Sequence, residues 1–175
     1  MKPQYRELLL RRRGLTARFI KQGMGEPLLY LHGAIASKGW NPFLDLLARE
    51  YTVYAPLQPG FEEVEGLDLL HDIVDLALYY FDLLDELGLE SVRVVGHFLG
   101  AMVAAEMAAL CSHYVSSLVL AAPAGFWRED TPIPDIFVMS DQEIRTNMWY
   151  DPQSSSALVT VPDNESEEEL SGRLL

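Results

Sequence analysis

The sequence predicts an α/β fold: a mostly parallel sheet of about six strands with an antiparallel hairpin at its N-terminal end. Three observations lead to this prediction. Short apolar runs alternate along the chain with longer segments of helical periodicity. Glycine and proline residues separate the two kinds of segment. Strands that are joined through helices of this length pair in parallel, by right-handed crossovers.

The composition fits one globular unit of ordinary size. The chain has 175 residues, of which 49% are hydrophobic, and a net charge of −13 at pH 7. Such a chain can bury a core, which excludes wholly disordered proteins. Its single cysteine excludes an internal disulfide framework. No apolar run reaches the roughly 18 residues of a membrane span, and the N-terminus lacks the apolar core of a secretory signal. We therefore expect a cytoplasmic protein without a membrane partner.

The N-terminal third of the chain predicts four strands and one helix. The expected strands cover residues 7–12, 16–21, 28–31 and 51–55. The first two flank a turn at Gly14 and predict a hairpin. The third is wholly apolar, which is typical of a strand that is covered on both faces. Asn41 and Pro42 match an N-cap and a first helical residue, and this helix should extend to residue 50.

The middle of the chain continues the alternation. Apolar residues recur at helical spacing from residue 68 to residue 87, and Gly88 provides the stop. The later expected elements are a strand at 92–95, a helix at 99–110, a strand at 115–121 and a short helix at 141–149. Five prolines interrupt the pattern beyond residue 121. No internal repeat is present.

Charge is distributed unevenly along the chain. Seven of the 13 basic residues lie in the first 21 positions. A basic segment can bind phosphates, but the rest of this chain is strongly acidic and would repel nucleic acid. We expect no nucleic-acid partner, and we interpret Arg11, Arg12 and Arg13 as charges that keep an edge hairpin soluble. Residues 163–169 hold five carboxylates, which is typical of a solvated tail.

The most informative segment is Gly96-His97-Phe98-Leu99-Gly100, which joins an apolar strand to a helix. A glycine at each end permits a very sharp turn, in which the central residue has a strained backbone conformation. The central side chain then points out above the sheet. The amide of Leu99 lies at the helix N-terminus and faces the same space.

With its elements in this order, the chain resembles the α/β-hydrolase family over roughly residues 5–150. His32-Gly33 is similar to the turn after the family's third strand, and residues 56–61 and 121–125 are similar to two later loops. The resemblance implies a truncated hydrolase core at 1–124, a partial helical lid at 125–152 and an acidic, poorly ordered tail at 153–175.

The resemblance also implies a site. Its nucleophile elbow would be formed by Gly96, His97 and Gly100 around position 98. Its oxyanion hole would be formed by His32, Gly33, Ala34 and Leu99, with the amides of Ala34 and Leu99 aimed at a substrate carbonyl oxygen.

Two departures from the family pattern affect function. The family's nucleophile, usually serine, is replaced by Phe98, whose ring has no lone pair for attack. The family's catalytic histidine follows its last strand, whereas the histidines here are His32, His71, His97 and His113. No catalytic residue is therefore assigned, and Glu129 and Asp130 are only weak candidates for the acid. Neither metal-ligand spacing nor a phosphate-binding glycine loop is present, so we predict no metal and no cofactor.

Three functional hypotheses follow. In the first, the chain is the N-terminal part of a hydrolase for esters or related bonds and is itself an inactive pseudoenzyme. In the second, it is a non-catalytic module that binds an apolar, ester-like small molecule or a partner protein. In the third, another site is catalytic and uses residues such as His32, Asp45, His97 or Glu129. In each case we expect strand 115–121 to be an exposed apolar edge that is prone to self-association.

Overall fold

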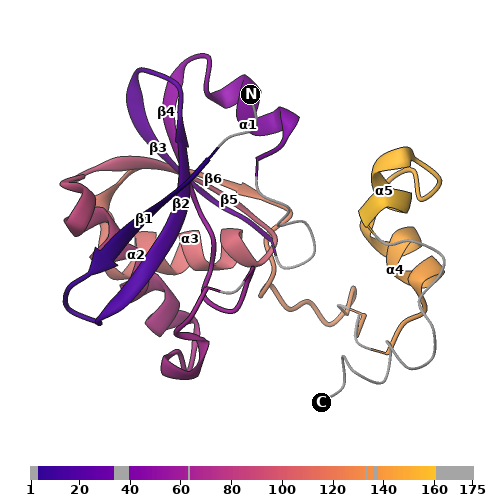
Figure 1. Ribbon diagram of the computed structural model, residues 1–175. Helices are drawn as coiled ribbons and strands as arrows, with labels where there is room; N and C mark the ends of the chain where they lie inside the picture. Colours follow the sequence, from indigo (N-terminus) through magenta and orange to yellow (C-terminus); the bar gives the residue numbers. More distant parts are fainter. Residues whose placement is uncertain (1–3, 34–39, 63, 133, 136–137, 161–175) are drawn as a thin grey trace. The chain divides into compact units, whose positions relative to one another are not determined.

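The computed structural model describes residues 4–33, 40–62, 64–132, 134–135 and 138–160 (Figure 1). The chain forms two compact units, Met1–Phe126 and Trp127–Leu175. The first unit contains the sheet and three α-helices, and the second contains α4 (Asp141–Met148) and α5 (Ser155–Thr160). Within the described ranges, no helix combines the length and the apolar character that crossing a bilayer requires.

One six-stranded sheet forms the centre of the first unit, with the strand order β1-β2-β4-β3-β5-β6. The strands are β1 (Tyr5–Leu10), β2 (Leu15–Gln22), β3 (Glu26–Leu31), β4 (Tyr51–Pro56), β5 (Val92–His97) and β6 (Val115–Ala121). The β1–β2 and β2–β4 pairs are antiparallel, and the other three pairs are parallel. The predicted α/β class, with a mostly parallel sheet and an N-terminal hairpin, is confirmed.

The helices of this unit are α1 (Pro42–Leu47), α2 (Ile73–Leu87) and α3 (Leu99–Leu110). The bounds of α3 and β6 are those predicted. The helix expected from residue 68 begins later, at Ile73, because the Asp72 carboxylate accepts a hydrogen bond from the Asp75 N–H at 2.9 Å and caps the helix there. Leu67–Leu69 form a separate 3₁₀ turn, and α1 ends three residues before the expected position.

Strand β3 lies between two apolar layers, as its sequence predicts. Leu29 and Leu31 belong to a large core with α2 and α3, whereas Leu28 and Tyr30 belong to a smaller core with Leu44 of α1. This alternation follows the two-residue period of a strand. In Figure 1, α2 and α3 lie side by side against one face of the sheet, away from α1.

The hairpin arginines are bound to α2. Arg11 contacts Glu86 at 2.8 Å, and Arg13 donates to Asp82 at 2.5 Å. Arg12 bridges Asp82 and Asp85 on the same helix. These three arginines therefore bind the β1–β2 turn to α2, in addition to placing positive charge at the edge of the sheet.

The second unit has its own local order. A capping box starts α4: the Ser140 hydroxyl accepts from the Glu143 N–H, and the Glu143 carboxylate accepts from the Ser140 N–H. The short helix α5 lies in the stretch where only a poorly ordered tail was expected. Residues 161–175 of that tail lie outside the described residues.

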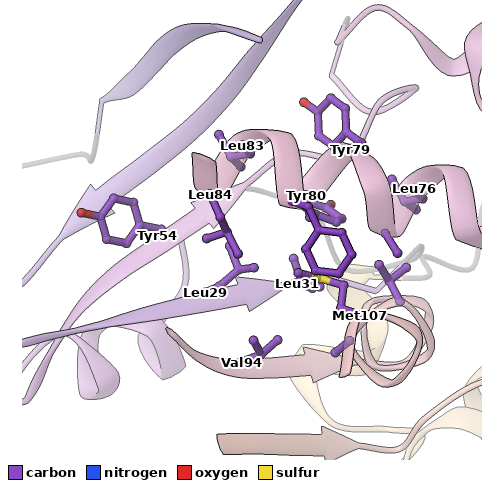
Figure 2. Packing of buried hydrophobic residues seen from close by; sticks show 14 of the residues in the cluster. Leu29, Leu31, Tyr54, Leu76, Tyr79, Tyr80, Leu83, Leu84, Val94 and Met107 are labelled. Carbon is purple, nitrogen blue, oxygen red and sulfur yellow. The ribbon is translucent and has the colours of Figure 1, made fainter. Parts of the chain in front are cut away.

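Two adjacent tyrosines of α2 are completely buried in the large core. Figure 2 shows Tyr80 directed towards Met107 and Leu31, with Tyr79 further along the same helix. Neither hydroxyl has a hydrogen-bond partner among the described residues. Burial raises the pKa of Tyr79 to about 12 and that of Tyr80 well above its ordinary value. A buried hydroxyl without a partner costs about 1–3 kcal/mol.

We therefore expect Tyr80→Phe to increase the free energy of unfolding by about 1 kcal/mol, because it removes the hydroxyl and keeps the ring. Urea unfolding monitored by circular dichroism measures the change. Tyr5→Phe is the matched control, since the Tyr5 hydroxyl donates to Glu62 at the surface and its loss gives no such gain. A decrease in stability for Tyr80→Phe would contradict the prediction.

Candidate functional site

The turn between β5 and α3 has the strained conformation that its sequence predicts. Phe98 has φ +50° and ψ −113°. Apart from glycines, only Glu62 and Ala122 share a positive φ among the described residues. A conformation of this kind costs an L-residue about 1–3 kcal/mol and persists only where its surroundings enforce it. The Phe98 side chain is half-buried.

Backbone hydrogen bonds hold Phe98 on both sides. Its N–H donates to the Ala121 carbonyl at 3.0 Å. Its carbonyl accepts from the Ala124 N–H at 3.1 Å and from the N–H groups of Ala101 and Met102 in the first turn of α3. The loop that follows β6 and the start of α3 thus fix the turn together.

The two flanking glycines allow a very close approach of α3 to the sheet. A Cβ on Gly96 would lie 2.4 Å from the Ala101 Cα, and one on Gly100 would lie 2.1 Å from the Leu31 carbonyl oxygen. Real Cβ atoms do not approach backbone atoms so closely. Only glycine fits at either position, and the start of α3 therefore lies against the end of β3.

The His32-Gly33 turn at the end of β3 lies beside the elbow. A Cβ on Gly33 would be 3.0 Å from both the Phe98 Cβ and the His97 Nδ1. The structure therefore brings Leu99 together with five other predicted site residues, which are His32, Gly33, Gly96, His97 and Gly100. As the first residue of α3, Leu99 has an N–H group without an intrahelical acceptor. Ala34, the remaining predicted residue, lies outside the described residues.

His32 holds the loop in place as a neutral ring. Its Nε2 accepts a hydrogen bond from the Gln58 N–H at 3.1 Å, so the proton is on Nδ1, which donates to the Gly33 carbonyl at 3.0 Å. Burial disfavours the charged ring and lowers the pKa of His32. These contacts make His32 a structural residue of the turn.

Gln58, after β4, was missed by the sequence analysis. Its side chain is almost completely buried, and its Nε2 donates to the His32 carbonyl at 2.6 Å. The Phe61 ring meets the His32 ring edge-on, with centroids 4.9 Å apart. The available signal was a lone amide between two prolines, directly after the strand that neighbours β3.

The other polar candidates have different surroundings. His97 is half-buried, and burial lowers its pKa. Asp45 lies in α1 and accepts a hydrogen bond from the Trp40 indole at 2.6 Å. Glu129 and Asp130 belong to the second unit, where Asp130 pairs with Arg128 at 2.6 Å.

Comparison with known proteins identifies the family of this fold. The model of the alpha/beta hydrolase family matches residues 28–172. The chain belongs to the α/β-hydrolase family. Among solved structures, naproxen esterase from Bacillus subtilis has a TM-score of 0.74 at 20% identity, and covers 93% of this chain and 61% of its own. That likeness concerns the fold.

The names of two curated relatives describe different kinds of enzyme. The dihydrolipoyllysine-residue acetyltransferase component of the acetoin cleaving system from Cupriavidus necator is 34% identical over 65% of this chain and 31% of its own length. The 2-hydroxy-6-oxo-6-(2'-aminophenyl)hexa-2,4-dienoic acid hydrolase from Metapseudomonas resinovorans is 28% identical over 69% of this chain and 43% of its own length. The chain thus spans less than half of each of these proteins.

Within the α/β-hydrolase fold, the geometry of Phe98 leads to a stability prediction. Phe98→Gly and Phe98→Ala both remove the ring, but only glycine accepts φ +50° and ψ −113° without strain. We expect the glycine variant to be about 1 kcal/mol more stable than the alanine variant, the reverse of the usual order inside regular structure. Urea unfolding of the two variants measures this difference. A more stable alanine variant would show that the turn relaxes when the ring is removed.

His32 leads to a prediction about pH. Its pKa in the folded chain is below the ordinary value of 6.5, so the unfolded chain takes up this proton first as the pH falls. The stabilising contribution is complete above about pH 6.5 and is lost below it, before most carboxylates titrate near pH 4. In urea unfolding at several pH values, we expect a smaller loss between about pH 6.5 and 5 for His32→Gln than for the native chain. Equal slopes would contradict the assignment.

Proposed function

We propose that this chain binds a small, apolar carbonyl compound beside the elbow and performs no covalent catalysis at position 98. In this proposal the chain keeps the family's ability to bind an ester-like compound but has no nucleophile at the elbow. The observation that carries the proposal is Phe98 itself, a residue without a nucleophilic atom in the strained central position of the elbow.

The donor side of the site supports binding. The N-terminus of α3 provides the Leu99 amide directly after Phe98. The His32-Gly33 turn lies close to the same residue, since a Cβ on Gly33 would be 3.0 Å from the Phe98 Cβ. A helix N-terminus favours a partial negative charge such as that on a carbonyl oxygen. The half-buried benzyl group of Phe98 offers an apolar surface to the rest of the ligand.

The relatives support the ligand class. One is named as a hydrolase of an aminophenyl hexadienoic acid with an oxo group, and another, from Acinetobacter baylyi, as a hydrolase of a methylene succinate. Both names describe small organic acids, the first with an oxo group beside an aryl group. We therefore propose an ester or ketone that carries an aryl group as the ligand.

The test uses the intact chain and methyl phenylacetate. We expect saturable binding in saturation-transfer NMR and no release of phenylacetate above a protein-free blank. Gly33→Ala places a methyl group 3.0 Å from the Phe98 Cβ and should weaken binding by about three- to tenfold. The control is Met24→Ala, at an exposed site before the opposite end of β3, which should bind normally.

Two results would overturn the proposal. Ester turnover that disappears in His97→Ala would establish a separate catalytic site, as in the third hypothesis. Failure of the folded chain to bind the ester saturably would remove the binding function. Thermal unfolding of each variant, followed by circular dichroism, separates loss of binding from loss of fold.

A further inference from the structure

We infer that Gln58 is the positioning residue of the candidate site, because it sets the orientation of the His32–Gly33 peptide against the elbow. The inference rests on the proposed function, since it names the residue that sets the spacing between Gly33 and Phe98, where the ligand is proposed to bind. Gln58 is almost completely buried, and it acts through the turn at the end of β3 rather than by touching the ligand.

Gln58 binds His32 through two separate hydrogen bonds. Its backbone N–H donates to the His32 Nε2 at 3.1 Å, and its side-chain Nε2 donates to the His32 carbonyl oxygen at 2.6 Å. Any residue except proline supplies the first bond, because that donor belongs to the backbone. The second bond requires a side chain that carries a donor. The side chain of Gln58 therefore serves the carbonyl of His32 and not its ring.

The His32 carbonyl lies just beyond the part of β3 that the sheet holds. The parallel pairing of β3 ends at Leu29 on the β4 side and at Leu31 on the β5 side. His32 itself is buried, and a buried carbonyl oxygen requires a donor. Gln58 provides this donor from the loop after β4, where the strand ladder no longer does.

The same peptide is packed against the start of α3. A Cβ on Gly100 would lie 2.6 Å from the His32 carbonyl oxygen, and one on Gly33 would lie 3.0 Å from the Phe98 Cβ. A peptide unit is planar, so its carbonyl oxygen and its N–H group turn together. By holding the oxygen, Gln58 holds the plane that joins His32 to Gly33. The position of Gly33 relative to Phe98 follows from that plane.

The loop that carries Gln58 is itself bound to β2. The Leu57 N–H donates to the Arg18 carbonyl at 2.9 Å, and the Arg18 guanidinium donates to the Glu62 carbonyl at 3.0 Å. Within the loop, the Phe61 N–H donates to the Gln58 carbonyl at 3.1 Å. A site keeps its geometry when the residues that support it are themselves held. Gln58 meets this condition, because its backbone is fixed on both sides.

Two substitutions separate the hydrogen bond from the filling of space. Gln58→Leu fills the space but has no donor, so the His32 carbonyl loses its partner. In Gln58→Glu, a protonated carboxyl donates to this carbonyl, whereas an ionised one only accepts. A fully buried glutamic acid can have a pKa of about 8–9, so this variant should lose its donor as the pH rises.

The other titratable groups near this contact are His32, His97 and Glu62. Burial lowers the pKa of His32, and the charge of Glu62 acts on that ring in the opposite direction. Burial also lowers the pKa of His97, whose Nδ1 faces Gly33. Both histidines are therefore largely neutral above about pH 6.5. The native chain, measured at each pH, accounts for what remains of their titration.

The test measures binding of methyl phenylacetate by saturation-transfer NMR at about pH 6.5 and about pH 9. We expect Gln58→Leu to bind about five- to tenfold more weakly than the native chain at both pH values. Gln58→Glu should bind like the native chain at the lower pH and like Gln58→Leu at the higher one. The matched control is Gln4→Glu, at an exposed position, which should bind like the native chain throughout.

A second measurement needs no ligand. In proton–nitrogen correlation spectra of the free chain, the amide signal of Gly33 reports on the turn and that of Leu99 reports on the elbow. We expect both signals to move in Gln58→Leu. In Gln58→Glu they should move between the two pH values by more than in the native chain, and in Gln4→Glu they should not.

Failure of the proposed function and failure of this inference give different results. If the native chain does not bind the ester, the proposed function fails, and the two amide signals alone decide the role of Gln58. Unchanged signals of Gly33 and Leu99 in Gln58→Leu would overturn the inference. Native-like binding by Gln58→Leu, or an equal loss of binding by Gln58→Glu at both pH values, would also overturn it. Circular dichroism establishes that each variant is folded.

Discussion

The close approach of α3 to the carboxyl ends of the parallel strands is the constraint on which this structure depends. Gly100 allows the helix to begin against the Leu31 carbonyl, and Gly96 allows the preceding strand to end there. With no side chain between them, β3, β5 and the start of α3 meet at one place. The His32-Gly33 turn and the elbow are therefore neighbours. The geometry of the candidate site thus depends on having glycine at both Gly96 and Gly100.

The same constraint explains how the elbow keeps its shape without a nucleophile. Four backbone hydrogen bonds hold Phe98: one to Ala121, and three that its carbonyl accepts. Together these bonds help to offset the about 1–3 kcal/mol of strain at this residue. None of them involves the side chain at position 98. The backbone geometry of the turn therefore does not depend on the side chain at position 98.

The sequence predicted the elements that depend on local pattern and missed those that depend on contacts. The bounds of α3 and β6 were predicted correctly, because flanking glycine and apolar runs mark them. The predicted start of α2 was five residues too early, because the helical spacing of apolar residues begins before the N-cap at Asp72. The ion pairs of Arg11 and Arg13 with α2 and the hydrogen bonds of Gln58 join residues far apart in the chain. No periodicity encodes such partners.

The two ends of the sheet are stabilised in different ways, and this difference bears on the site. At the hairpin end, arginines and the carboxylates of α2 join two elements through charge. At the β6 end, the loop that begins at Ala121 binds the backbone of Phe98 directly. Strand β6 carries this loop, and its pairing with β5 therefore helps to hold the turn that orients the Leu99 amide. Strand β6 and the elbow are therefore consecutive parts of one hydrogen-bonded path.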